Sequence, residues 1–252
     1  MTLRVYEPLS SRQQSGALLW IHGGGFVMGT PSMNDRLCLE VARRLGVVVF
    51  SPEYRLSPKH PYPTPLDDCM QAWTYMQDHA RAYGIASDKV AVGGQSAGGG
   101  LAAMLALRLA EASGNQPIAQ WLFSPMLDDR TAAARELDGI GHFTWGNDSN
   151  RFGWTSFLAA EPGSDGVPAE AVPARAASLS SLPPTWMGVG TIDLFHDENR
   201  RYATALADAG VRVRLSTVPG APHGFEEMSP QSTVVRNYID DALAWLEACL
   251  QR

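Results

Sequence analysis

Short apolar runs alternate with longer stretches in which apolar residues recur at helical spacing along most of this sequence. The β-rich runs predict strands at Leu3–Tyr6, Ala17–His22, Val47–Ser51, Val90–Gly94, Gln120–Phe123, Trp186–Val189 and Val211–Val218. The stretches between them predict helices at about Asp35–Leu45, Pro65–Tyr83, Ala97–Ser113, Asp197–Ala209 and Thr233–Leu250. This alternation is typical of βαβ units and predicts an α/β fold with a mostly parallel central sheet flanked by helices.

Residues 128–184 interrupt the alternation. They contain GIGHFTWGNDSNRFGWTSFL, then a stretch rich in glycine, proline and alanine, and no strand–helix pair. Ligands of parallel α/β sheets bind outside the carboxyl ends of the strands, so an insertion between two strands is well placed to form a lid. We therefore expect one domain over residues 1–252 with an insertion that contributes to the substrate pocket. A surface excursion without a substrate role is the alternative.

Composition narrows the classes of partner. The chain has 252 residues, 45% of them hydrophobic, which is enough for a substantial core. Its formal net charge of -6 gives no attraction to nucleic acid or to an anionic membrane. We expect neither a nucleic-acid partner nor an integral membrane segment, because no run approaches the roughly 20 apolar residues that span a bilayer.

The cysteines Cys38, Cys69 and Cys249 are far apart and match no zinc-ligand spacing. We interpret them as buried thiols in a reducing compartment and expect no bound metal. The N-terminal residues lack the apolar core of a signal peptide. A cytoplasmic location is therefore predicted.

The sharpest chemical signal is VAVGGQSAGGG, in which an apolar strand runs through Gly94, Ser96 and Gly98 into a helix rich in alanine and leucine. This is the G-x-S-x-G nucleophile elbow in its required strand–turn–helix context. The strained turn needs residues with almost no side chain two positions before and after the serine. We identify Ser96 as the candidate nucleophile.

A second signal, WIHGGGF, follows the strand that ends at His22. Consecutive glycines expose backbone N–H groups that no side chain obstructs, as an oxyanion requires. The predicted oxyanion hole consists of the N–H groups of Gly23, Gly24 and Ala97.

The acid and the base should follow the serine in this order, each after a later strand. Asp193, in GVGTIDLFHDEN, comes directly after a predicted strand, whereas Asp197 and Glu198 begin the next helix. Among the six histidines, His223 in PGAPHGFEE has the favoured order and location. The predicted catalytic triad is Ser96, Asp193 and His223, in which Asp193 orients the imidazole.

The motifs HGGGF, YRLSPKHPYPTPLDD, GQSAGG, GTIDLFHDE and HGF, in this order, resemble the hormone-sensitive-lipase-like family of bacterial carboxylesterases, from about Ala17 to the C-terminus. The resemblance implies the α/β-hydrolase fold and a serine carboxylesterase that hydrolyses short- to medium-chain carboxylic esters through an acyl-enzyme, with no cofactor. It supports the triad and the oxyanion residues above, and it makes Arg55 and Asp68 structural candidates. The implied partner is a small-molecule ester.

Two departures from this family matter. Its elbow usually has Asp or Thr where this sequence has Gln95, so no role is carried over to that position. Its members usually begin with helices over the active site, whereas this sequence starts almost at the sheet, which predicts a missing or reduced N-terminal cap and a pocket roofed by the insertion. The aromatic residues expected near substrate are Phe143, Trp145, Phe152, Trp154 and Phe157. Packing of these rings onto the domain is an equally supported interpretation.

Proteins with other functions share this scaffold. A ligand-binding receptor on this scaffold, such as the plant gibberellin receptors, lacks the catalytic histidine, so His223 argues against it. An amidase, or a deacetylase of acetylated sugars, stays open because a few pocket residues would suffice to select such substrates. The family often dimerises through its last strand and a neighbouring helix, here Val211–Val218 and the segment from Thr233, so a homodimer is a further prediction. The pattern of Arg212 and Arg214 equally suits a solvated edge strand.

Overall fold

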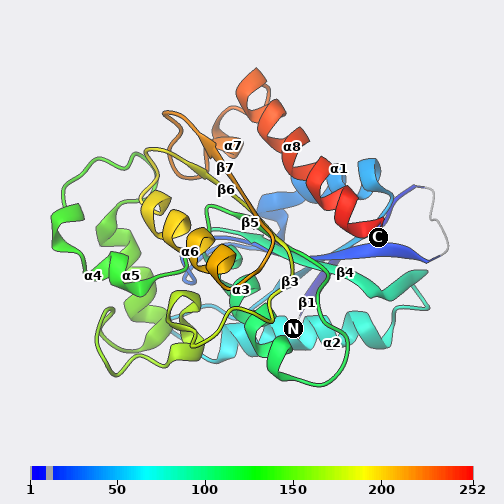
Figure 1. Ribbon diagram of the computed structural model, residues 1–252, viewed down its shortest axis with the longest axis horizontal. Coiled ribbons are helices and arrows are strands. Elements are labelled where there is room, and N and C mark those ends of the chain that lie inside the picture. Colours follow the sequence, from blue (N-terminus) through cyan, green and yellow to red (C-terminus); the bar gives the residue numbers. More distant parts are fainter. Residues whose placement is uncertain (1, 10–13, 252) are drawn as a thin grey trace.

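A computed structural model describes residues 2–9 and 14–251, and its strands and helices alternate along the chain (Figure 1). The strands are β1 (Thr2–Tyr6), β2 (Ser15–Ile21), β3 (Val48–Glu53), β4 (Ile85–Gln95), β5 (Gln120–Phe123), β6 (Thr185–Gly190) and β7 (Val213–Val218). The α-helices are α1 (Asp35–Leu45), α2 (Thr64–Asp78), α3 (Ala97–Glu111), α4 (Asp129–Ala133), α5 (Asn147–Leu158), α6 (His196–Asp208), α7 (Phe225–Met228) and α8 (Thr233–Leu250). Short 3₁₀ turns are η1 (Pro31–Asn34), η2 (Arg135–Leu137), η3 (Ala169–Ala171) and η4 (Pro173–Arg175).

The strands form a 7-stranded sheet in the order β1-β3-β2-β4-β5-β6-β7. β1 pairs antiparallel with β3, while every other neighbouring pair is parallel. The predicted mostly parallel α/β sheet is confirmed. Its parallel strands leave their carboxyl ends on one edge, where the loops of several strands meet.

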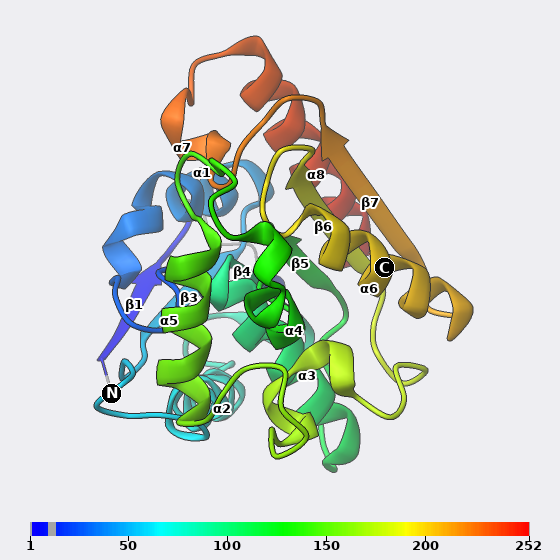
Figure 2. The ribbon, with the colours of Figure 1, turned by 90° about the vertical axis from the view of Figure 1, so that its left-hand side faces the viewer.

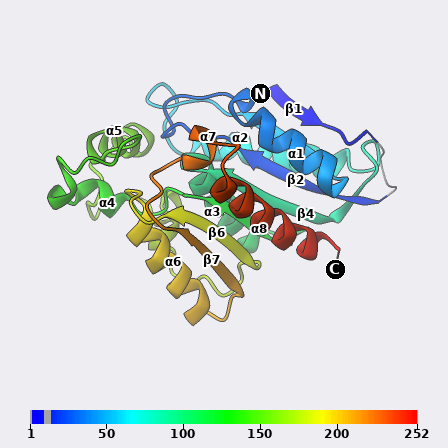
Figure 3. The same cartoon turned by 90° about the horizontal axis from the view of Figure 1, so that it is seen from above.

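Helices cover both faces of the sheet, with α1 and α8 on one face and α2, α3 and α6 on the other (Figure 3). The central strand β2 shows why both faces are needed. Its side chains alternate, so Leu18 and Trp20 pack with α1 and α8, whereas Leu19 and Ile21 pack with α2 and α3. Such strands read as continuous apolar runs because neither face meets water.

The largest differences from the predicted boundaries lie between α2 and β4. The helix expected to reach Tyr83 ends at Asp78, and turns follow until Gly84, whose φ of 66° reverses the chain. The strand expected from Val90 already begins at Ile85, which pairs with Ser15 of β2. Polar residues such as Asp88 and Lys89 concealed this early part of the strand from a pattern of apolar positions.

Residues 128–184 lie between β5 and β6 and contain α4 and α5 with the turns η2, η3 and η4. The segment lies at one end of the sheet, where α5 stands in front of the strands (Figure 2). α5 was not predicted, because its first turn, Asn-Asp-Ser-Asn, is polar and conceals the helical spacing. Across the described ranges, no helix combines the length and the apolar character that a membrane crossing requires.

Candidate active site

The candidate residues lie at the carboxyl ends of three neighbouring or nearby strands. Ser96 follows β4, Asp193 follows β6, and His223 follows β7. Because these strands are parallel, their ends converge on one edge of the sheet. The fold thus brings together residues that are 127 and 30 positions apart in the sequence.

Ser96 occupies a sharp turn between β4 and α3. Its φ of 55° and ψ of -121° are unusual for a residue with a side chain. The turn is held in place by its backbone, since Ser96 N donates to Phe123 O at 2.8 Å and Ser96 O accepts from Gly100 N at 3.0 Å. These bonds stabilise the strained turn and keep the hydroxyl at the N-terminal end of α3.

Glycines make this turn sterically feasible. A Cβ on Gly98 would lie 2.1 Å from the carbonyl oxygen of Ile21 and 2.3 Å from that of His22, so α3 approaches the end of β2 at backbone contact. A Cβ on Gly94 would lie 2.4 Å from the carbonyl oxygen of Gly98. The two glycines of the predicted elbow are therefore required by close approach of the backbone.

The three predicted triad side chains form a continuous chain of hydrogen bonds. Nδ1 of His223 lies 2.9 Å from Oδ2 of Asp193, and Nε2 lies 2.9 Å from Oγ of Ser96. An ionised carboxylate can only accept, so Nδ1 carries the proton and Nε2 can accept from the serine hydroxyl. This tautomer is the one that general-base activation of a serine requires.

The environment of His223 favours the protonated form of its imidazole and so raises its pKa. Burial opposes ionisation of the ring, but the nearby charge of Asp193, its hydrogen bond and the charge of Glu226 together raise the pKa of His223 above its ordinary value. The other oxygen of Asp193 accepts from the backbone N–H of Phe195 at 2.9 Å. The Phe195 ring also packs edge-on against the imidazole, with centroids 5.0 Å apart, and so limits its rotation.

The glycine turn of HGGGF lies against the elbow. A Cβ on Gly23 would lie 3.3 Å from Cβ of Ser96, while Gly24 adopts a φ of 115° and its carbonyl oxygen accepts from Met28 N at 3.0 Å. Ala97 is the first residue of α3 and is buried beside them. The predicted oxyanion residues Gly23, Gly24 and Ala97 thus belong to two turns that meet at Ser96.

His22 stabilises the glycine turn through a hydrogen bond. Its Nδ1 donates to the carbonyl oxygen of Gly23 at 2.8 Å, and its ring stacks on Tyr54 with centroids 4.3 Å apart. Burial lowers the pKa of His22 to about 4, so the ring is neutral near pH 7. Tyr54 in turn donates to the carbonyl oxygen of His22 at 3.0 Å.

The segment that precedes α5 touches both sides of the site. Thr144 Oγ1 donates to the carbonyl oxygen of His223 at 2.6 Å. The next residue, Trp145, lies over the glycine turn, where a Cβ on Gly25 would be 2.3 Å from its ring. Figure 2 shows this loop reaching toward α7, which begins two residues after His223.

Four of the five predicted aromatic residues divide into two groups, while Trp145 is half-buried. Trp154 and Phe157 are fully buried against Phe26 of the HGGGF motif, with ring centroids 5.2 Å and 4.2 Å from it. Phe143 and Phe152 are 80% and 59% exposed. Packing therefore occupies the first pair, whereas the second pair is accessible from solvent.

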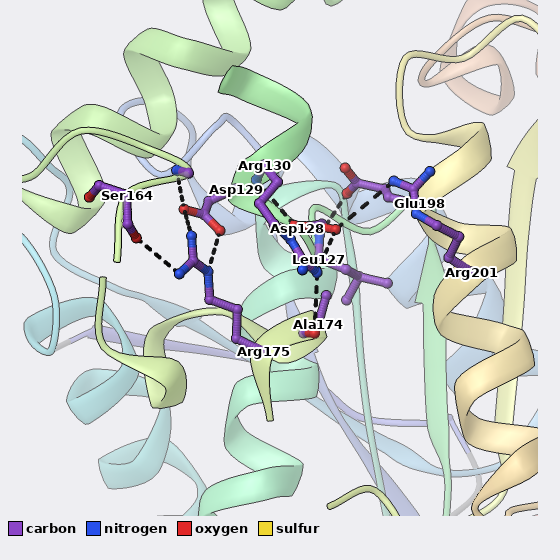
Figure 4. A network of polar contacts seen from close by, with 10 residues as sticks. Leu127, Asp128, Asp129, Arg130, Ser164, Ala174, Arg175, Glu198 and Arg201 are labelled. Atoms are coloured by element: carbon purple, nitrogen blue, oxygen red, sulfur yellow. Dashed lines mark hydrogen bonds and ion pairs between the residues drawn. The ribbon is translucent and has the colours of Figure 1, made fainter. Parts of the chain in front are cut away.

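A buried polar network orders the insertion internally and the chain just before it (Figure 4). Asp129 accepts from Arg175 Nε at 2.8 Å and from the backbone N–H of Gly163 at 2.6 Å. Glu198 on α6 accepts from the backbone N–H of Leu127 at 2.8 Å, just before the insertion. Because α6 begins shortly after Asp193, this helix contacts the residue just before the insertion and also follows the loop that carries Asp193.

Arg55 and Asp68, the structural candidates, form a bidentate ion pair. Arg55 Nε and Nη2 donate to the carboxylate at 2.9 Å and 2.8 Å, and the Arg55 backbone N–H adds a bond of 2.8 Å. Burial would raise the pKa of Asp68, but the hydrogen bonds from Arg55 lower it below its ordinary value. The pair ties the segment after β3 to α2.

Sequence reasoning missed the supporting contacts of Thr144, Phe195 and Glu226. Glu226 lies three residues after His223 in the sequence, and an acidic residue this close to the candidate histidine is the signal that could have been followed. The four-residue helix α7 is too short to be predicted from periodicity. No cluster of metal-ligating side chains occurs in residues 2–9 and 14–251.

Comparison with known proteins defines the class. The model of a family described as alpha/beta hydrolase fold matches residues 18–227, and the chain belongs to this family. The resemblance to hormone-sensitive-lipase-like carboxylesterases is thereby confirmed, as is the fold class.

The relatives and solved structures similar to this chain include proteins named as ester hydrolases. Esterase LipI of Mycobacterium tuberculosis is 32% identical over 88% of this chain and 70% of its own length. Ethyl acetate hydrolase of Pseudomonas putida is 32% identical over 100% of this chain and 78% of its own. The solved structure of a bacterial heroin esterase superposes with a TM-score of 0.94 at 36% identity, covering 99% of this chain and 80% of that one.

Proposed function

We propose that this protein is a serine carboxylesterase that hydrolyses short- to medium-chain carboxylic esters through an acyl-enzyme intermediate. The observation that carries the proposal is the unbroken chain of hydrogen bonds from Asp193 through His223 to Ser96. The names of the relatives, which include an esterase and an ethyl acetate hydrolase, support the same class of reaction.

In the proposed mechanism, His223 Nε2 removes the Ser96 proton as Oγ attacks the ester carbonyl carbon. The tetrahedral intermediate then collapses, and the protonated imidazole gives its proton to the leaving alcohol. Water then loses a proton to His223 as it attacks the acyl carbonyl carbon. The imidazolium returns this proton to Ser96 Oγ as the second tetrahedral intermediate collapses and the carboxylic acid leaves. Asp193 stays ionised throughout and stabilises the imidazolium that forms twice in each cycle.

The oxyanion is assigned to the backbone N–H groups of Gly23, Gly24 and Ala97. Two of these residues belong to the glycine turn, and the third opens α3, whose positive end faces the developing charge. The hydrogen bond of neutral His22 to Gly23 supports this role, because it fixes the turn without placing another charge there. No metal or organic cofactor enters the proposed reaction.

We assign the insertion, residues 128–184 of a single domain, to the wall of the substrate pocket. Trp145 lies beside the glycine turn of HGGGF, and Phe143 and Phe152 have exposed rings. Trp154 and Phe157 act beneath them, by holding α5 against Phe26. This arrangement suits small, mostly apolar esters.

The first test follows hydrolysis of p-nitrophenyl esters from acetyl to palmitoyl by the wild type and by Ser96→Ala. The exposed Ser113→Ala provides the matched control. We expect rapid turnover of short chains that is lost only in the Ser96 variant. A matched amide should react far more slowly, and comparable rates on the amide would replace the esterase by an amidase.

We further propose a cytoplasmic location and a homodimer. The buried thiols of Cys38 and Cys69 support a reducing compartment. β7 lies at the end of the sheet and offers an edge that a second copy could extend. Light scattering on the purified protein gives the oligomeric state directly.

A further inference from the structure

A chain of side-chain hydrogen bonds runs beside the triad without belonging to it. Trp20 Nε1 donates to Asn34 Oδ1 at 3.0 Å, Asn34 Nδ2 donates to Gln95 Oε1 at 3.3 Å, and Gln95 Nε2 donates to Glu226 Oε1 at 2.6 Å. The first bond is fully buried, and the chain ends on a carboxylate that is only 2% exposed.

The indole fixes the direction of every bond. Tryptophan Nε1 can only donate, so the oxygen of the Asn34 amide must face it. The nitrogen of Asn34 then faces Gln95 and selects the oxygen of that amide, which leaves the nitrogen of Gln95 for Glu226. Glu226 Oε1 therefore accepts a hydrogen bond from Gln95 Nε2, and such a bond is strongest when the carboxylate is ionised.

The last two residues of this hydrogen-bond chain connect the loops that carry Ser96 and His223. Gln95 directly precedes Ser96 on the elbow, and Glu226 comes three residues after His223. The 2.6 Å bond between them therefore bridges the same two loops that the Ser96–His223 bond bridges. Two parallel links resist a change in the distance between nucleophile and base better than one.

Glu226 also contributes charge. Burial raises the pKa of Glu226 above its ordinary value, although its own backbone N–H, the hydrogen bond from Gln95 and the charge of His223 oppose this shift. The titratable and charged groups around it are His223 and Asp193 on the catalytic loops, Tyr238 on α8, the neighbouring Glu227, and Arg36 on α1, which donates to its backbone carbonyl at 3.2 Å. Its Oε2 has no hydrogen-bond partner within the described ranges.

We propose that Gln95 and Glu226 form a clasp that positions His223 over Ser96, and that the Glu226 carboxylate is a second negative group, beside Asp193, that stabilises the imidazolium. Both are positioning residues, since each acts through the triad. This inference rests on the proposed function and deepens it. It gives Gln95, where the family usually has Asp or Thr, a specific role: its amide nitrogen donates to Glu226, which a residue without an N–H donor could not do.

Two variants separate the two parts of the proposal. Glu226→Gln keeps an oxygen that can accept from Gln95 but removes the charge. Gln95→Leu keeps a similar volume but removes the donor. Glu227→Gln is the matched control, because Glu227 is the adjacent carboxylate of the same short helix and is 37% exposed beside Arg36. Thermal unfolding verifies that each variant is folded.

For Glu226→Gln, we expect the acidic limb of the pH profile of kcat/KM to move to lower pH by about half to one unit, because loss of a nearby negative charge lowers the pKa of His223. Glu227→Gln should leave the limb in place. For Gln95→Leu, we expect kcat to fall about tenfold with KM within about twofold, since the loosened loop misplaces the base rather than the substrate.

An NMR titration of the His223 ring makes the test independent of turnover. The resonance is assigned with His223→Asn, and its pKa is compared in the wild type, Glu226→Gln and Glu227→Gln. An equal pKa in the last two variants, or wild-type kcat in Gln95→Leu, overturns the proposal. A wild type that hydrolyses no ester refutes the proposed function instead, and the NMR comparison still decides the electrostatic link.

Discussion

Gly98→Ala is the substitution whose effect follows most directly from the geometry of the elbow. Its new Cβ would lie 2.1 Å and 2.3 Å from the carbonyl oxygens of Ile21 and His22, where real Cβ contacts under 3.0 Å essentially never occur. Both obstacles are backbone atoms at the end of the central strand β2, and they cannot rotate away as a side chain would. The start of α3 and the end of β2 must therefore separate by about 1 Å.

The separation has two consequences of different size. Overpacking of this kind costs about 1–3 kcal/mol, and a contact with rigid backbone belongs at the upper end. For a chain of this length, about 3 kcal/mol corresponds to a decrease in Tm of roughly 6–12 °C. The glycine turn of HGGGF follows β2, and Ser96 precedes α3. A displacement of about 1 Å between them should lower kcat/KM about 100-fold.

The assay combines thermal unfolding with hydrolysis of a short p-nitrophenyl ester well below the Tm of the variant. Gly166→Ala is the control, because its Cβ would meet nothing within 4 Å, and its Tm and kcat/KM should equal those of the wild type. A Gly98→Ala protein with unchanged Tm would refute the steric argument. A lower Tm with unchanged kcat/KM would show that the strain is relieved away from the glycine turn of HGGGF.

Three further predictions follow from the site and its surroundings. Asp193→Asn should lower kcat about 10⁴-fold with little change in KM, as judged from steady-state kinetics, because an amide can donate to Nδ1 and select the wrong tautomer of His223. The kcat/KM of the wild type should fall as pH decreases through a pKa above the ordinary value of about 6.5, since the base must be neutral and its environment raises its pKa; a midpoint below that value contradicts the assigned surroundings. Phe157→Ala should lower the free energy of unfolding in urea by about 3–5 kcal/mol because the ring is buried on Phe26, whereas the exposed Phe152→Ala should change it by less than about 0.5 kcal/mol.

The sheet and most helix boundaries could be predicted from the sequence because burial imposes a pattern on each element. Strand β5 and helices α1 and α8 have the predicted bounds, and all three consist of residues whose apolar spacing matches the element. The early part of β4 and the helix α5 were missed. Both begin with polar residues whose conformation is set by pairing or by tertiary packing rather than by local pattern.

The residues of the site differ in the same way. Ser96, Gly94 and Gly98 were predictable because a strained turn restricts the residue types that fit it. Asp193 and His223 were predicted from chain order and their position after strands, and the structure brings both side chains into contact with each other and with Ser96. The contacts of Thr144 with His223, and of Gln95 with Glu226, join segments 79 and 131 residues apart, and no local signal in a single sequence indicates such pairs.

The support of His223 shows how these long-range contacts complete what the turn motifs begin. Asp193 holds the ring through Nδ1, Thr144 holds the backbone carbonyl of the same residue, and Glu226 holds the following turn through Gln95. The three partners come from the end of β6, from the insertion and from the elbow, so no single loop fixes the base. The insertion is therefore coupled to the position of His223, which is the general base in the proposed mechanism. Substitutions in it can consequently alter kcat even where the side chain concerned makes no contact with the substrate.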